Sequence, residues 1–95
     1  MENIVLTVAG QPDLSFKGVG VAGESDRNTG QIVRVFETEK GHWLIAVFAA
    51  SGSLKNHKVI MNKNEAELIK ELGFSEVSKM LYKQMGVSYT QKLDV

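Results

Sequence analysis

Basic side chains that suit an anionic ligand gather in one short stretch in the second half of this sequence. Lys55, His57, Lys58 and Lys63 lie close together along the chain, and Arg34 belongs to a strand that we expect nearby. Ammonium and guanidinium groups bind phosphates and other anions. These residues therefore predict a modest anion or nucleic-acid patch. Lysines on an exposed edge strand also prevent pairing with other chains, and this second interpretation stays open.

Residues 18–23, Gly-Val-Gly-Val-Ala-Gly, formally match the glycine pattern of dinucleotide-binding loops. In such a loop the glycines lie between a strand and a helix whose N-terminus holds the pyrophosphate. The next segment, which begins at Glu24 and ends at Gly30, is polar without an apolar period and leaves no room for that helix. We expect no cofactor here. We predict instead a glycine-bearing strand that a neighbouring backbone approaches closely, followed by a mobile loop.

The side chains best suited to catalysis or metal binding are too scattered to form a site. His42 and His57 fall on different expected strands, and a zinc site needs three or four convergent ligands. Ser51 and Ser53 lie in a turn that lacks the strand-to-helix elbow of a serine hydrolase. We therefore predict no metal site and no catalytic residues, and the sequence leans against an enzyme.

The run at residues 43–50 is apolar at nearly every position, which is typical of a strand buried on both faces. One cover can come from the helical C-terminal third. The other must come from a second sheet layer or from a second copy of the protein. We predict a homodimer, with Trp43, Ile45 and Val47 as candidate interface residues, because so short a chain has little material to cover both faces.

The hydrophobic period changes from 2 to 3.6 after residue 61, so strands precede helices and the class is α+β. We expect an antiparallel meander of about five strands, two short helices and an extended C-terminal segment, in a single domain at residues 1–95. Ser75 should cap the second helix and Gly86 should close it. The expected strands are 4–9, 14–22, 31–37, 43–50 and 54–61. The apolar stripe expected on the second helix comprises Val77, Met80, Leu81 and Met85.

Composition limits the partners and the compartment. Eleven basic residues balance eleven acidic ones, so no net field draws in nucleic acid or an anionic membrane. Nucleic acid is therefore a partner that we do not favour, and we expect no membrane association. The chain has no cysteine, which suits a reducing compartment, and its N-terminus has no signal-peptide pattern. We expect the cytoplasm.

The C-terminal segment alternates in character, and we expect residues 87–95 to pack back on the domain as a last strand or an ordered tail. Its ending, Gln-Lys-Leu-Asp-Val, resembles the terminal motif of the EXLDI family, named for Glu-x-Leu-Asp-Ile. Leu93 and Asp94 match that motif, whereas Gln91 and Val95 replace its glutamate and isoleucine. The resemblance covers the last two-thirds of the chain. It implies a small bacterial protein without an assigned reaction, and it brings no catalytic residues.

Two functional interpretations follow. The first is a non-enzymatic interaction module that self-associates through its sheet, which the doubly apolar strand at residues 43–50 favours. The alternative is a small regulator that binds nucleic acid or a small ligand through the polar loop at residues 24–30 and the basic patch from Lys55 to Lys63.

Overall fold

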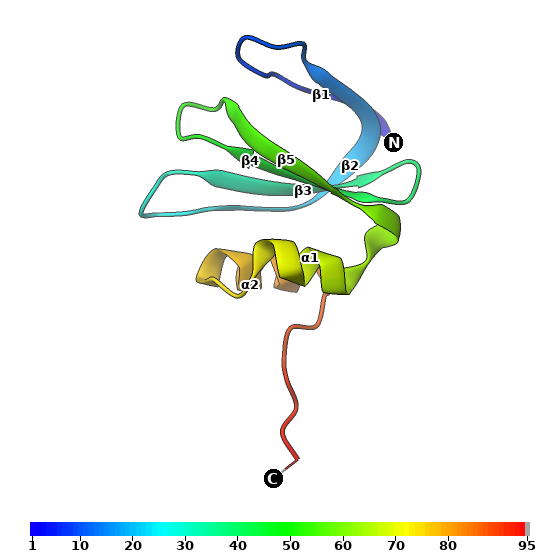
Figure 1. Ribbon diagram of the computed structural model, residues 1–95, viewed down its shortest axis with the longest axis vertical. Coiled ribbons are helices and arrows are strands. Elements are labelled where there is room, and N and C mark those ends of the chain that lie inside the picture. Colours follow the sequence, from blue (N-terminus) through cyan, green and yellow to red (C-terminus); the bar gives the residue numbers. More distant parts are fainter. Residues whose placement is uncertain (95) are drawn as a thin grey trace.

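The computed structural model of this chain describes residues 1–94 and has the predicted α+β fold. A five-stranded antiparallel sheet is followed by a short 3-10 turn, two helices and an extended C-terminal segment (Figure 1). Each strand pairs with its neighbour in the sequence, which confirms the predicted meander. The strands are β1 (Glu2–Leu6), β2 (Leu14–Ser25), β3 (Ile32–Thr38), β4 (Trp43–Phe48) and β5 (Leu54–Ile60). The helical elements are η1 (Met61–Lys63), α1 (Glu65–Leu72) and α2 (Glu76–Met85).

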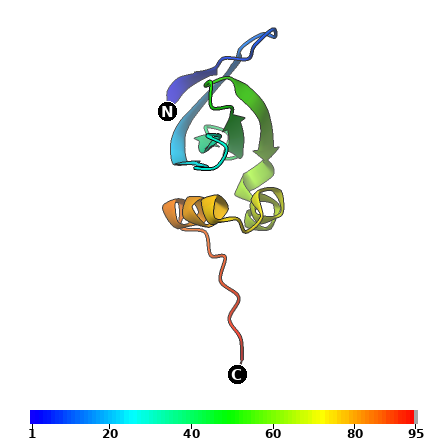
Figure 2. The same ribbon diagram turned by 90° about the vertical axis from the view of Figure 1, so that its left-hand side faces the viewer.

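The long strand β2 bends the sheet. Its first part pairs with β1 and its second part with β3, and the register shifts between Gly20 and Ala22, which marks a β-bulge. A bulge adds an unpaired residue and bends the strand that carries it. The β1–β2 hairpin therefore curls back over one face of the sheet, as the two views in Figures 1 and 2 show.

Gly18 lies on β2 beside the end of β3, where it pairs with Thr38. A Cβ atom at this position would sit 2.6 Å from the backbone oxygen of Glu37, which no real side chain tolerates. The glycine-rich stretch is thus a strand that a neighbouring backbone approaches closely, as predicted. Because β2 continues to Ser25 and a turn follows it, no helix begins where a dinucleotide-binding loop needs one.

Strand β4 is buried on both faces, and each face belongs to a different core. Trp43 and Ile45 point toward the helices, whereas Leu44 and Ala46 point toward the curled hairpin. The chain thus supplies its own second sheet layer, which was one of the two covers that the sequence allowed. The core on the helical side contains Val35, Trp43, Ile45, Ile60, Leu68, Tyr82 and Val87. The core on the hairpin side contains Leu6, Phe36, Leu44, Ala46 and Leu54.

Helix α2 begins and ends as predicted, but its buried face is rotated from the predicted one. The Ser75 side chain accepts a hydrogen bond from the backbone N–H of Ser78, and Gly86 closes the helix in the left-handed conformation. The buried residues are Ser78, Leu81 and Tyr82, while Met80 is 43% exposed. Placing Met80 in the apolar stripe was therefore wrong. The buried face of the helix runs through Ser78 and Tyr82, which are four residues apart, and Met80 lies between them in the sequence and on the solvent side.

The corner between α1 and α2 is held by side-chain hydrogen bonds from α2. The Ser78 hydroxyl donates to the backbone oxygen of Leu72 at 2.8 Å, and the Tyr82 hydroxyl donates to that of Gly73. The last carbonyls of a helix have no partner within the helix itself, so these two bonds satisfy the end of α1. They also fix the angle between the two helices.

The C-terminal segment does not return to the sheet. Val87 is buried and the Tyr89 ring packs on Tyr82 with ring centres 5.7 Å apart, but Leu93 is 67% exposed. The expectation of a last strand was wrong for all of residues 87–94, which form no strand, because the chain leaves the helical layer on the side away from the sheet (Figure 1). The alternative, a tail packed on the domain, holds only at its start, at Val87 and Tyr89. Val95, the last residue of that prediction, lies outside the described residues.

We predict that Gly18→Ala destabilises the protein by about 1–3 kcal/mol, since the new methyl group has to push away the backbone of β3. Gly23→Ala is the matched control on the same strand. Its Cβ would meet its nearest neighbour at 3.7 Å, which is ordinary contact, so it should change the free energy of unfolding by less than about 0.5 kcal/mol. Urea unfolding of the two variants would measure both values, and equal losses would contradict the close crossing.

A second prediction concerns Tyr82, whose pKa is raised above 10.0 because burial disfavours the phenolate. The unfolded chain then loses this proton more readily than the folded one. The stability that neutral Tyr82 contributes is therefore fully present below about pH 10 and is lost as the pH rises through the folded pKa. Tyr82→Phe should cost about 1 kcal/mol near neutral pH and should show a weaker loss above about pH 10. Urea unfolding at several pH values tests this, and identical alkaline slopes would contradict it.

Candidate functional site

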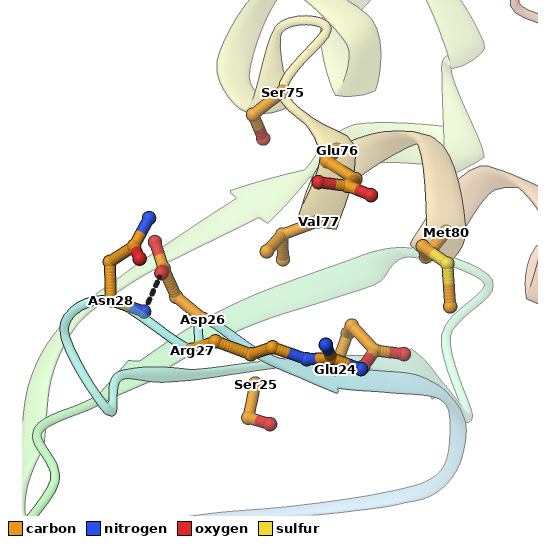
Figure 3. A pocket seen from close by; sticks show the side chains of 9 residues that line it. All are labelled: Glu24, Ser25, Asp26, Arg27, Asn28, Ser75, Glu76, Val77 and Met80. Atoms are coloured by element: carbon orange, nitrogen blue, oxygen red, sulfur yellow. Dashed lines mark hydrogen bonds between the residues drawn. The ribbon is translucent and has the colours of Figure 1, made fainter.

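A groove lies between the end of the β2–β3 hairpin and the first half of α2. Its volume is about 400 Å³, and it is open to solvent along one side. Figure 3 shows the α2 residues on one side of it and the hairpin residues on the other. The lining residues are Glu24, Ser25, Asp26, Arg27, Asn28, Ser75, Glu76, Val77 and Met80.

The hairpin side of the groove is an ordered turn. The Asp26 carboxylate accepts a hydrogen bond from the backbone N–H of Asn28 at 2.8 Å, the dashed line in Figure 3. The backbone of Asp26 also bonds to Gln31 and to Gly30, each at 2.8 Å. Because an Asp side chain that bonds two residues ahead stabilises a tight turn, this short connection is closed by its own hydrogen bonds. The segment predicted as a mobile loop at residues 24–30 is therefore partly strand, up to Ser25, and partly this turn.

The α2 side of the groove is apolar at its centre. Val77 is half-buried and Met80 is exposed, so both present carbon and sulfur surface to the groove. Phe74, which directly precedes the capping residue Ser75, is 59% exposed. An apolar residue at that position commonly packs on the fourth helical residue, but here the fourth residue is Lys79. The Phe74 ring is therefore left at the surface beside the groove.

The groove carries more negative than positive charge. Glu24, Asp26 and Glu76 contribute carboxylates, and Arg27 contributes the one guanidinium among the lining residues. Within residues 1–94, no group of carboxylate or imidazole side chains is arranged to hold a metal ion. The arrangement is thus an acidic groove with an apolar wall, suited to a basic partner with some apolar surface.

Gln84 joins the two sides of the groove behind the lining residues. Its side-chain oxygen accepts the Gly23 backbone N–H at 2.9 Å, and its amide nitrogen donates to the Glu24 carboxylate at 3.2 Å. One side chain on α2 therefore holds both the backbone of β2 and an acidic side chain of the groove. It sets how far the helix stands from the strand.

The three candidate interface residues on β4 face the helices. Trp43 and Ile45 are buried, at 9% and 3% exposure, and Val47 is half-buried against the same core. Contact with a partner through these side chains would require α1 and α2 to move away from the sheet. The surface available to a partner therefore lies elsewhere.

The five basic residues of the predicted patch do not lie on one surface. Arg34 and His57 share the face opposite the helices, because both pair across Ala46, whereas Lys58 pairs with Ile45 and shares the helical face. The Arg34 guanidinium stacks over the Phe36 ring, 4.9 Å from its centre.

Of the other two basic residues, Lys63 binds the Glu37 carboxylate at 2.9 Å, and Lys55 lies on β5 beside a register shift. Part of the predicted patch does form a continuous exposed segment. This segment is residues 55–59 of β5, the outer strand of the sheet.

Sequence reasoning found the hairpin half of the groove but missed the α2 half. Val77 and Met80 were assigned to the core, so no groove was expected between them and the loop. Tyr82 was the available signal, because a large buried side chain at that position rotates Met80 toward solvent.

Comparison with protein-family models, curated proteins and solved structures finds no match for this chain, so its resemblance to the EXLDI family stays a prediction. Within the described residues, no helix is long and apolar enough to cross a membrane.

We predict that Gln84→Ala loosens the groove without unfolding the domain. Loss of a hydrogen bond worth about 1 kcal/mol should speed amide hydrogen exchange at Gly23 by roughly fivefold. Lys83→Ala, an exposed change next to it on the same helix, is the control and should leave that rate unchanged. An unaltered Gly23 rate in Gln84→Ala would show that the bond does not hold β2 to α2.

Proposed function

We propose that this chain is a non-enzymatic interaction module that self-associates, with the acidic groove of one copy receiving the β5 edge of another. The observation that carries the proposal is the match in charge between the two surfaces. Three carboxylates, from Glu24, Asp26 and Glu76, line the groove, while the exposed run on β5 contains Lys55 and Lys58. This surface keeps the sheet as the element of self-association but moves the contact from its buried face to its edge.

The apolar parts of the two surfaces also fit one another. Val59 on β5 is 44% exposed and lies on the opposite face of the strand from Lys58, so the edge presents an apolar side chain on one face and a basic one on the other. In the groove, Val77 and Met80 lie beside Glu76. Aliphatic contact at the centre with charge pairs around it is the usual anatomy of a protein interface.

The edge position of β5 adds a second reason. β5 is the last strand in the sheet order, so its outer backbone groups pair with no strand among residues 1–94. Such an edge commonly receives or joins another chain. If each copy inserts its edge into the groove of the other, the assembly closes as a two-fold dimer. A stable contact of this kind should bury more than about 1,000 Å² in total.

The polar groups of the groove favour binding over catalysis. Its residues include neither histidine, and the Ser75 oxygen already accepts the N–H of Ser78 as a helix cap. The same carboxylates would repel a phosphate backbone, so a regulator that binds nucleic acid fits this surface less well than self-association does. The proposal extends to the cellular compartment. We propose that the protein is cytoplasmic, because a chain without cysteine suits a reducing compartment.

Sedimentation velocity over concentrations around 100 µM would test the proposal. The wild-type protein should shift from monomer toward dimer as concentration rises. Lys58→Glu and Glu76→Lys should each weaken association at least about fivefold, because each places like charges in the contact. The combination of both changes should recover most of the lost affinity, since the charge pair is then re-formed in reverse.

Lys70→Glu on α1 is the matched control, because Lys70 is exposed and lies outside both surfaces. It should leave association unchanged. A wild-type protein that stays monomeric throughout this range would overturn the proposal. So would dimers that respond to neither reversal. Binding of a short oligonucleotide that weakens as salt rises would instead support the regulator.

A further inference from the structure

A second cavity, of about 370 Å³, lies at the opposite end of α2 from the groove. It is bordered by the ends of β3 and β4, by the bulge in β2, by η1 and by the last turn of α2, and it is open to solvent. Its volume falls at the lower end of the range typical of small-molecule sites. The lining residues are Val21, Glu37, Trp43, Lys63, Gln84 and Met85.

Three local features bring these side chains together. The register shift in β2 falls at Val21, and Val21 packs on the core that faces the helices. Glu37 and Trp43 are direct cross-strand partners, so their side chains lie next to each other on that same face. Met85 ends α2 and closes the cavity from the helical side. The result is an apolar wall of three residues with one carboxylate at its margin.

Lys63 supplies the positive charge beside this carboxylate, and its backbone has an unusual conformation. Its ammonium donates to Oε1 of Glu37 at 2.9 Å. Lys63 and the residue before it, Asn62, both adopt positive φ angles, of 53° and 55°. The Asn62 backbone N–H donates to Nδ1 of His42 at 2.9 Å, which holds this strained turn in place.

Strain of this kind in a lysine exceeds what a half-exposed ion pair returns in stability. Residues in strained conformations collect at ligand sites, where the surrounding fold holds them for a purpose. The Glu37–Lys63 pair can also form further hydrogen bonds. Among residues 1–94, no hydrogen bond reaches Oε2 of Glu37, and the Lys63 ammonium has donors left beyond the one given to Oε1.

We propose that this cavity binds a small zwitterion with an apolar side group, of the chemical class of a free aliphatic α-amino acid. The ligand ammonium would bind Glu37, its carboxylate would bind Lys63, and its side group would contact Trp43, Val21 and Met85. A zwitterion keeps the site electrically neutral and leaves neither protein charge without a partner. A ligand with a single charge would satisfy one member of the pair and leave the other exposed to repulsion or desolvation.

This site is independent of the proposed self-association, since the cavity and the groove share no lining residue. Gln84, which lines the cavity, reaches the groove only through its bonds to Gly23 and Glu24. The two proposals can therefore fail separately.

The protein carries its own reporter for the test. Trp43 is its single tryptophan and lines the cavity, so a ligand that enters should change the tryptophan fluorescence. The probes are L-leucine, N-acetyl-L-leucine, which lacks the ammonium, and isopentylamine, which lacks the carboxylate. We expect L-leucine to change the emission in a saturable way and to bind at least about tenfold more tightly than either analogue.

Two variants locate the binding. Glu37→Gln and Lys63→Met keep the approximate size of the side chain and should each lower the affinity for L-leucine by at least about tenfold. Lys70→Met, far along α1, is the control and should bind as the wild type does. Both tested side chains are half-exposed, so the variants should fold, and their circular dichroism should confirm it.

Several results would overturn the proposal. No saturable change with L-leucine up to about 10 mM in the wild-type protein would do so, since weaker binding is not specific recognition. Equal affinity for all three probes would show that the site does not recognise the ammonium and carboxylate groups of the ligand. Unchanged affinity in both folded variants would place the binding elsewhere. Because the three-probe comparison uses the wild-type protein, it decides the matter even if a variant fails to fold.

Discussion

The requirement to cover β4 on both faces shapes the rest of this structure. Trp43 and Ile45 need apolar cover on one side, and Leu44 and Ala46 need it on the other. Helices can serve one face only, so the other must be covered by sheet. A chain of 95 residues is too short to form a second, separate sheet. The β1–β2 hairpin therefore folds back over the face of the same sheet. The bulge in β2 allows that bend, and the glycine at position 18 allows the close approach that the bend requires.

The helical cover has consequences at both ends of α2. This helix packs chiefly along β2, and Gln84 holds the two elements together by bonds to Gly23 and Glu24. A straight helix cannot follow a bent strand over its whole length, so space remains beyond each end of the contact. The groove lined by Glu76 occupies one of these spaces, and the cavity lined by Glu37 occupies the other. Both candidate sites thus arise from the same mismatch of shape.

The amino-acid pattern predicted the strands, their meander order, the two helices and the caps of α2, because each of these depends on residues close together in the sequence. It predicted the double burial of β4 for the same reason. It did not predict which face each basic residue occupies, since that depends on the register between strands. Nor did it place Met80, because the phase of α2 is set by Tyr82 reaching a carbonyl of α1. The tail was misjudged because alternation reveals a capacity for pairing and not whether a partner strand is within reach.

The order of the strands also bears on how the chain acquires its structure. Every strand pairs with the strand that precedes or follows it, so each pairing closes a short loop and none waits for a distant segment. The sheet can grow by adding one hairpin at a time, and such local topologies fold faster than those built on distant pairings. We expect the two faces to be covered after the sheet has formed, when the hairpin bends over one face and the helices pack on the other. Until that moment β4 exposes both of its apolar sides, which makes its Trp43–Phe48 segment the point at which a nascent chain is most exposed to aggregation.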